Sequence, residues 1–388
     1  MFFEYEKEKP KLLEEIKDLN GDLHIPKGLW RDTIDSYKKE EVLRRLKELI
    51  NNDEIKFPFR EYSLLEVQEE YQRLKTSSES FSKGSWECNR LVRQTDLLYK
   101  GQSLYIPRTA RLGSRASDLF TQAVRMEVGH QRFLSPKRAW ESEKKAFLNY
   151  LFNPDMFEGD INDKALRTAL SMRSYVASQF KPESAKIVYD TFQAKNVLDF
   201  SAGWGDRLVG FHASNAESYV GVDPNSKLHE PYGQINSFCN TGKRAEMICS
   251  PAEDMDLGDK TFDFVFTSPP YFDIERYSQE DTQSWKRYPE VNSWVKGFLF
   301  PTLEKCWGHL SEGGRILVNI ADKKGFDLCT PMLKHMESLG ATYEGVIGYE
   351  MYQRAGQKTK KAFCEPVWVW SKGGASEFKL KKENFFGV

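Results

Sequence analysis

The feature that most constrains the fold is an alternation of short β-rich runs with helix-like stretches, which begins at Asn196. The β-rich runs are residues 197–200, 219–222, 246–249, 262–266 and 314–320, and helix-like stretches such as 291–310 and 328–339 lie between or after them. Such an alternation predicts an α/β fold with a parallel, doubly wound sheet. Ligands of these sheets bind beyond the carboxyl ends of the strands. The residues that follow each run are therefore the candidates for a functional site.

The first β-rich run ends in a glycine-containing turn. Asp199 closes the run, and Gly203 and Gly205 follow it before the next helix-like stretch. Glycines at such a turn let the backbone approach a ligand closely. The second run ends in Asp223, at about the offset of twenty residues at which a carboxylate bonds ribose hydroxyls. Leu208 stands where a dinucleotide fingerprint has its third glycine, so the pattern predicts a nucleoside cofactor without a pyrophosphate.

A second motif follows the fourth β-rich run. Ser268, Pro269, Pro270 and Tyr271 come directly after Thr267. Two prolines donate no backbone hydrogen bonds and end a central strand, which turns their carbonyl groups outward. Ser268 and the Pro269 carbonyl can accept the two N–H bonds of an exocyclic amine, and Tyr271 offers a flat face for a base. The alternative interpretation of the two prolines is an ordinary turn.

Together these motifs resemble the S-adenosylmethionine-dependent amino-methyltransferases that act on nucleic-acid bases, chiefly the DNA N6-adenine and N4-cytosine methylases. The resemblance covers about residues 175–372. It implies a Rossmann-like class I methyltransferase fold with an antiparallel C-terminal edge, and S-adenosyl-L-methionine as the cofactor. Serine before the two prolines slightly favours N4-cytosine over N6-adenine.

The resemblance also implies roles for individual residues. Ser268, Pro269, Pro270 and Tyr271 would hold the target amine, and Asp223 would hold the ribose. The family's usual aspartate near the adenine ring is absent, with Pro251 in its place, so Glu253 and Asp254 stay open as alternatives there. The residues that would bind the rest of the cofactor are Phe180, Asp199, Ser201, Gly203 and Gly205.

The last part of the chain predicts a strand pair. Residues 343–349 and 365–370 are expected to pair as an antiparallel edge of the sheet. The segment between them, 354–361, is basic and includes Lys358. Phosphate contact by this segment and a solvated run of charge are competing interpretations.

The organisation predicted for the chain has three parts. Residues 1–165 form a mainly helical N-terminal domain that chooses the target, 166–375 form the catalytic domain, and 376–388 form a tail. Between Lys83 and Lys145 there are thirteen Lys/Arg against six Asp/Glu. Aromatic residues interleave with this positive charge, which suits a nucleic-acid surface, although a solvated basic face is equally compatible with it. The candidate phosphate contacts are Arg108, Arg111, Arg115, Arg132 and Arg138.

Composition sets further limits on the class of protein. Net charge is −1, so affinity for a polyanion must come from local basic patches. No apolar run reaches the ~18 residues that cross a bilayer, and no signal peptide is recognisable, which predicts a cytosolic or nuclear enzyme. Six dispersed cysteines predict free thiols, and methyl transfer requires no metal. DNA is the expected partner, and the oligomeric state stays open.

Three other functions compete with DNA methylation. An RNA base methyltransferase would share the catalytic core. A protein glutamine methyltransferase would attack an amide through a similar loop. The third is a nucleic-acid-binding protein whose methylase core is inactive.

Overall fold

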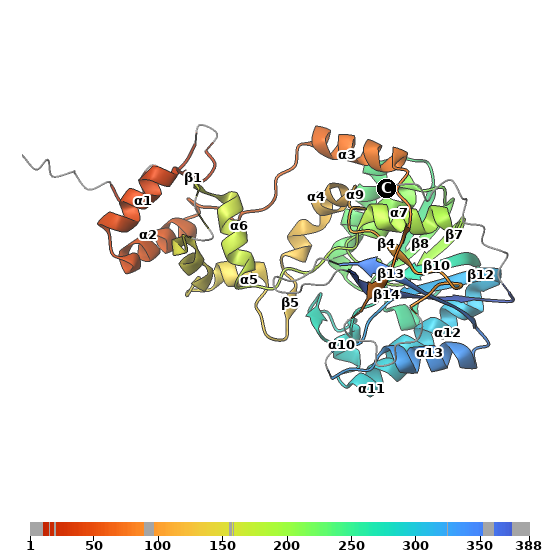
Figure 1. Cartoon of the computed structure of the whole chain (residues 1–388). Helices are drawn as coiled ribbons and strands as arrows, with labels where there is room; N and C mark the ends of the chain where they lie inside the picture. The colour runs from red at the N-terminus through yellow and green to blue at the C-terminus, as the bar shows by residue number, and fades with distance from the viewer. Residues whose placement is uncertain are drawn as a thin grey trace, which may run out of the picture. The chain divides into compact units, whose positions relative to one another are not determined.

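The computed structural model divides the chain into two units (Figure 1). It describes residues 11–14, 16–18, 21–88, 97–154, 157, 159–323, 325–351 and 361–374. The first unit joins Met1–Glu61 with Arg125–Ala177, and the second joins Tyr62–Val124 with Ser178–Val388. The boundary predicted near residue 165 thus falls inside the first unit. Two separate segments of the chain form the first unit, so a division of the sequence into consecutive domains does not describe it.

The first unit is mainly helical. Helix α2 buries Val42, Leu46, Leu49 and Ile50, a spacing that places them on one face. They form one core with Trp30 and Phe147. The elements of this unit are β1 (His24–Ile25), α1 (Lys27–Ser36), α2 (Lys39–Asn51), β5 (Gly129–His130), α5 (Pro136–Glu141), the 3-10 helix η1 (Ala146–Phe152), β6 (Ile161–Asn162) and α6 (Asp163–Ser171).

The second unit is built on the predicted sheet, and the Rossmann-like α/β class is confirmed. The strand order is β9 (Arg244–Ile248), β8 (Ser218–Val222), β7 (Asn196–Asp199), β10 (Phe262–Thr267), β12 (Leu310–Asn319), β14 (Ala362–Ser371) and β13 (Thr342–Glu350). The strands from β9 to β12 are parallel, whereas β14 runs antiparallel to both β12 and β13. The predicted antiparallel pair near the C-terminus is therefore confirmed.

The sheet continues beyond that pair with strands from early in the sequence. Strand β4 (Leu104–Ile106) pairs with β13, and β2 (Ser82–Lys83) pairs with β4. A further short strand, β3 (Trp86–Glu87), pairs with β14. The N-terminal region predicted to be one helical domain thus contributes to the sheet of the second unit. These strands are too short to show an alternating pattern, and they cover an edge whose backbone groups would otherwise be unpaired.

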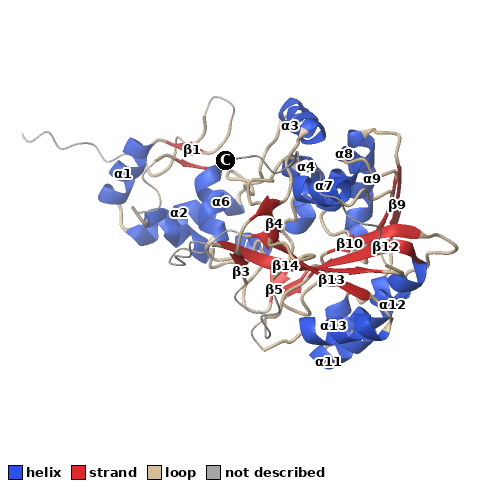
Figure 2. Cartoon of the chain, turned by 45° about the vertical axis from the view of Figure 1, so that its right-hand side comes forward, coloured by secondary structure: helices blue, strands red, loops and turns tan. Residues whose placement is uncertain are grey.

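Helices cover both faces of the sheet (Figure 2). One face carries α7 (Pro182–Thr191), α8 (Asp206–Ala213), α9 (His229–Cys239) and α3 (Leu64–Thr76), together with α4 (Ser114–Arg125). The other carries α11 (Val291–Trp294), α12 (Phe300–His309) and α13 (Cys329–Ser338). The stretch predicted to be helix-like, 291–310, is helical without a break from α11 to α12. Its middle part, Val295–Leu299, is a π-helix.

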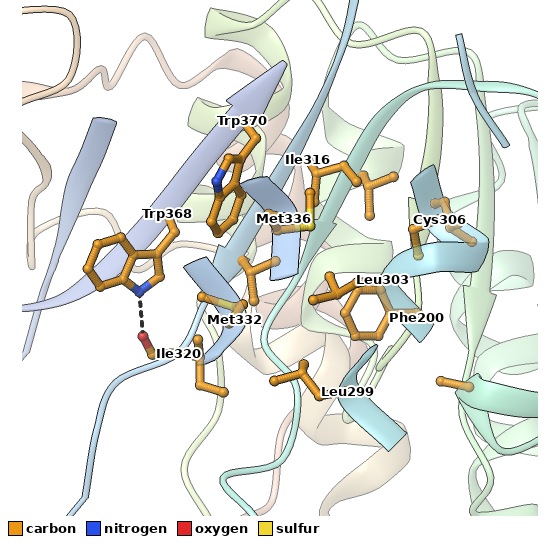
Figure 3. Packing of buried hydrophobic residues seen from close by; sticks show 14 of the residues in the cluster. Phe200, Leu299, Leu303, Cys306, Ile316, Ile320, Met332, Met336, Trp368 and Trp370 are labelled. Carbon is orange, nitrogen blue, oxygen red and sulfur yellow. Dashed lines mark hydrogen bonds between the residues drawn. The ribbon is translucent and has the colours of Figure 1, made fainter. Parts of the chain in front are cut away.

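A buried hydrophobic cluster lies between the sheet and the helices of the second face (Figure 3). Leu303 of α12 and Met332 of α13 pack against the sheet with Trp368. The Trp368 indole donates a hydrogen bond of 2.9 Å to the Ile320 carbonyl, directly after β12. This bond ties β14 to the carboxyl end of β12 inside the core. Among the described residues, which include every cysteine, there is no disulfide and no helix long and apolar enough to span a bilayer.

Candidate functional site

The glycine turn predicted after the first β-rich run lies after β7, and both of its glycines adopt a left-handed backbone. Gly203 has φ +57° and Gly205 has φ +75°, a region that residues with a Cβ rarely enter. A Cβ on Gly205 would lie 2.6 Å from the end of the Ile235 side chain, so packing adds to the backbone conformation in favouring glycine here. A Cβ on Gly203 would meet only the Ser201 carbonyl, at 3.8 Å. Gly203 therefore faces open space, into which a ligand can approach the backbone.

Asp199 is a fully buried junction between the turn and its neighbouring strands. Its carboxylate pairs with Arg207 of α8 at 2.7 Å. It also accepts bonds from the Tyr219 hydroxyl at 2.7 Å and the Thr267 hydroxyl at 3.0 Å. The Ser201 amide donates to the same carboxylate, and Arg207 donates to the Ser201 carbonyl. Asp199, predicted to bind cofactor, thus directs its carboxylate into the protein and holds the turn in place.

Asp223 joins the end of β8 to the glycine turn. One of its oxygens accepts from the Gly203 amide at 2.9 Å, and the other accepts from the Asn225 amide at 2.9 Å. Burial raises the pKa of Asp223 to about 7, although the two backbone hydrogen bonds oppose that shift. Each carboxylate oxygen retains a second lone pair that can accept a further bond. The geometry therefore suits a ligand hydroxyl group beside Gly203.

Glu253 and Asp254 follow β9 in the 3-10 helix η3 (Ala252–Asp254). Both pair with Arg287, at 2.6 Å and 2.7 Å respectively. Glu253 is buried, which raises its pKa, whereas Asp254 is exposed. Of the two alternatives for a contact with the adenine ring, Glu253 thus has the enclosed position.

Phe180 belongs to an aromatic stack that supports the turn. Its ring stacks on Tyr349 with centroids 4.7 Å apart and meets Phe266 edge-on at 5.6 Å. The Arg207 guanidinium lies 5.3 Å from the Phe180 ring centroid. This segment, predicted to fold over the cofactor, is thereby fixed beside Asp199 and Arg207.

The Ser268–Tyr271 loop leaves the sheet at the end of β10, as its two prolines predict. Thr267, the last residue of β10, bonds Asp199, so the loop and the glycine turn share one buried carboxylate. Phe272, the next residue after the loop, has φ +59°. Such a backbone is strained for a bulky side chain. Packing of the Phe272 ring against Phe326 and Trp294 holds it there.

Two residues that the sequence did not single out surround Tyr271. The Tyr271 hydroxyl donates to Glu365 of β14 at 2.9 Å, and burial raises the pKa of Tyr271. Lys323 bonds the other Glu365 oxygen at 3.0 Å, and its ammonium lies 4.3 Å from the Tyr271 ring centroid. One face of the ring predicted to stack on a base is therefore covered by Lys323. Glu365 reaches this edge because β14 is antiparallel, so it begins where its neighbour β12 ends.

The predicted nucleic-acid-binding residues are divided between the two units. Arg108, Arg111 and Arg115 belong to the second unit, and Arg132 and Arg138 belong to the first. All of these side chains are exposed. Arg115 forms an ion pair with Glu70 at 3.1 Å. Lys358 lies outside the described residues.

Comparison with known proteins finds a partial sequence match. No protein-family model matches the chain. A stretch of 91 residues is 30% identical to the type II beta methyltransferase M.BslI of Bacillus sp. strain NEB-606. This stretch spans 23% of the present chain and 9% of that protein.

Solved structures similar to this chain carry methyltransferase names. A SAM-dependent O-methyltransferase from Thermotoga maritima is 11% identical, with a TM-score of 0.35 over 52% of this chain and 69% of that one. TrmN from Thermus thermophilus is 12% identical, with a TM-score of 0.35 over 50% of this chain and 49% of that one. The strand order described above, rather than these low scores, supports the class I methyltransferase fold. That fold and the open space at Gly203 are consistent with S-adenosylmethionine as the cofactor.

The buried Asp199–Arg207 pair yields a prediction about stability. Arg207→Met should lower the free energy of unfolding by about 3–5 kcal/mol, because it leaves a buried carboxylate without its partner. Chemical denaturation of both proteins measures this difference. Lys195→Met is the matched control, since it breaks an exposed pair with Glu217, and such pairs contribute about 0–1 kcal/mol. Equal losses in the two variants would contradict a central role for Asp199.

Proposed function

We propose that this chain is an S-adenosylmethionine-dependent methyltransferase that modifies the exocyclic amine of a base in DNA, with N4 of cytosine favoured over N6 of adenine. The observation that carries the proposal is the joining of two motifs at one edge of the sheet. Asp199 bonds both Arg207 beside the glycine turn and Thr267 before the Ser268–Tyr271 loop. Methyl transfer requires the cofactor and the target amine to lie next to each other. One buried group holds both the turn and the loop that we propose to bind them.

On the cofactor side, three groups fit S-adenosylmethionine. The open space at Gly203 admits a ligand against the backbone. Asp223 accepts bonds from the ribose hydroxyls, and Glu253 lies near the adenine. The cofactor supplies an electrophilic methyl group. The residues of the chain supply its orientation, so catalysis consists largely of positioning and electrostatics.

On the target side, the loop supplies two acceptors. An amine attached to an aromatic ring is a poor nucleophile because its lone pair is delocalised into the ring. Ser268 and the Pro269 carbonyl accept its two N–H bonds and draw the nitrogen toward tetrahedral geometry. The Tyr271 ring supports the base on the face that Lys323 does not cover. A base within a duplex must first be extruded, which costs a few kcal/mol.

The choice of DNA rests on the serine-containing loop and on exposed arginines in both units. The competing outcomes are methylation of RNA, methylation of a protein glutamine, and no methylation. Each should be tested with labelled S-adenosylmethionine and with DNA, RNA and peptide substrates, followed by mass analysis of nucleosides and amino acids. The proposal expects label in N4-methylcytosine or N6-methyladenine from DNA. Label in RNA or protein alone would refute the DNA assignment.

The raised pKa of Asp223 predicts a pH dependence of cofactor binding. Ribose hydroxyls donate to the ionised carboxylate, so affinity for S-adenosylmethionine should rise as the pH increases through about 7. At pH 6 only about a tenth of the molecules are ionised, which weakens the apparent affinity up to about tenfold relative to pH 8. Isothermal calorimetry across this range measures the effect.

Asp223→Asn is the control for that titration, because an amide does not ionise. Its affinity for the cofactor should be lower than that of the wild type at pH 8 and nearly independent of pH. The raised pKa lowers the stability of the ligand-free protein as the pH rises, because Asp223 ionises at a lower pH in the unfolded chain than in the folded one. The stability contribution of Asp223 is full below its ordinary pKa of 3.8 and is lost as the pH rises to about 7. A flat wild-type affinity profile would refute the ribose assignment.

The contact between Glu365 and Tyr271 predicts a separate effect on the methylation rate. Glu365→Leu removes both the acceptor of the Tyr271 hydroxyl and the partner of Lys323, so the ring is no longer fixed. Misplacement by about 1 Å lowers a rate roughly 100-fold, and this is the loss we expect in single-turnover methylation. Glu365→Gln retains an acceptor for Tyr271 and should lose much less. Both variants should keep the wild-type affinity for the cofactor, and an unchanged rate in Glu365→Leu would exclude the role.

A further inference from the structure

An exposed apolar surface lies in the first unit, where two segments of the chain meet. Phe133 and Leu134 belong to the turn after β5, and their exposed fractions are 53% and 48%. Met172 and Val176 follow α6 and are 47% and 39% exposed. The Tyr175 amide donates a hydrogen bond of 2.8 Å to the Leu134 carbonyl, so the two segments are in direct contact. Exposed apolar side chains that gather in this way mark an interaction site.

Hydrogen bonds fix the turn that carries the two most exposed of these side chains. The His130 amide donates to the Phe133 carbonyl at 3.2 Å, and the Arg132 amide donates to the His130 ring at 3.0 Å. The His130 ring packs on Tyr175, with ring centroids 4.9 Å apart. On the other side of the turn, Ser135 is buried and caps α5. The apolar side chains are therefore presented to the outside by a turn that is anchored at both ends.

The same two segments carry an excess of positive charge. Residues 129–138 and 171–177 contain three arginines and one lysine, and no aspartate or glutamate. The lysine, Lys137, pairs with Glu127 at 2.9 Å, so the excess comes from the arginines. All three arginines are exposed, and they are Arg132, Arg138 and Arg173. Because the guanidinium group matches the geometry of phosphate, the charge of this surface complements a polyanion.

We propose that the first unit binds duplex DNA through this surface, with Phe133 and Leu134 as an apolar wedge between base pairs and the arginines on the phosphates. Proteins that bend DNA insert such side chains between base steps and thereby unstack them. A second copy of this chain fits less well, since a symmetric contact would bring the same positive charges together. The inference rests on the proposed DNA substrate. It adds deformation of the duplex to the phosphate contacts that the sequence predicts.

Phe133→Ala combined with Leu134→Ala tests the wedge, because this double variant loses apolar surface and keeps every charge. It should bind a duplex of mixed sequence about tenfold or more weakly than the wild type, as expected when burial of a phenylalanine is lost. The dependence of the affinity on salt should not change, since no phosphate contact is removed. Fluorescence anisotropy at several salt concentrations measures both quantities. Affinity equal to that of the wild type would overturn the proposal.

Two single variants complete this test. Arg132→Gln should reduce the slope of affinity against salt by about 0.9, because one phosphate contact is lost. An unchanged slope would overturn the phosphate contact. Leu65→Ala is the matched control for the wedge, since Leu65 is 64% exposed on α3 of the second unit. It should bind DNA like the wild type, and a loss equal to that of the double variant would overturn the proposal.

A duplex with a single bulged nucleotide distinguishes a wedge from a contact along the groove. One base step of this duplex is already unstacked, so the wild type should bind it more tightly than the fully paired duplex. The double variant should lose that preference, and a wild type without it would overturn the wedge. Sedimentation of the free protein tests the other occupant. A wild-type dimer that the double variant dissociates would show that the surface joins two copies, and would also overturn the proposal.

The methylation assay separates failure of this inference from failure of the proposed function. If the double variant binds and methylates DNA like the wild type, the wedge alone fails. If the wild type neither binds nor methylates DNA, the proposed function fails and the inference fails with it.

Discussion

The arrangement of the site depends on one buried carboxylate. Asp199 contacts groups from β8, β10, the glycine turn and α8, so its charge connects elements that come from distant parts of the sequence. A buried charge is costly unless it is paired and fully hydrogen-bonded. Arg207 provides the pair, and hydroxyls and a backbone amide provide the remaining bonds. Because so many partners meet at one group, the glycine turn and the target loop have fixed positions relative to each other.

The direction of β14 adds a second constraint. An antiparallel strand begins at the edge where its parallel neighbours end, so Glu365 at the start of β14 reaches Tyr271 after β10. Lys323, after β12, completes the group. The proposed target site is therefore built from three strand ends, and the two residues outside the motif cover one face of the Tyr271 ring and bind its hydroxyl.

The segment after the target loop couples the two proposed binding sites through the chain itself. It leaves the strained backbone at Phe272 and returns to Ser226 and Glu253. The sequence alone predicts no specific contacts for this stretch, because polar residues without periodicity carry no signal for the surfaces they will meet. Its contacts connect the loop after β8 with the loop after β9.

The sequence by itself determined the order of the motifs along the central strands, the glycine turn after the first of them and the end of β10 at two prolines, because these follow from local backbone chemistry. It also indicated the antiparallel pair at the C-terminus. Only the tertiary structure decided that Asp199 points inward, that Glu365 and Lys323 flank Tyr271, and that the short strands β2 and β4 extend the sheet. These features arise from pairing between segments far apart in the chain, and a single sequence carries no local signal for which distant charge or strand edge will be satisfied.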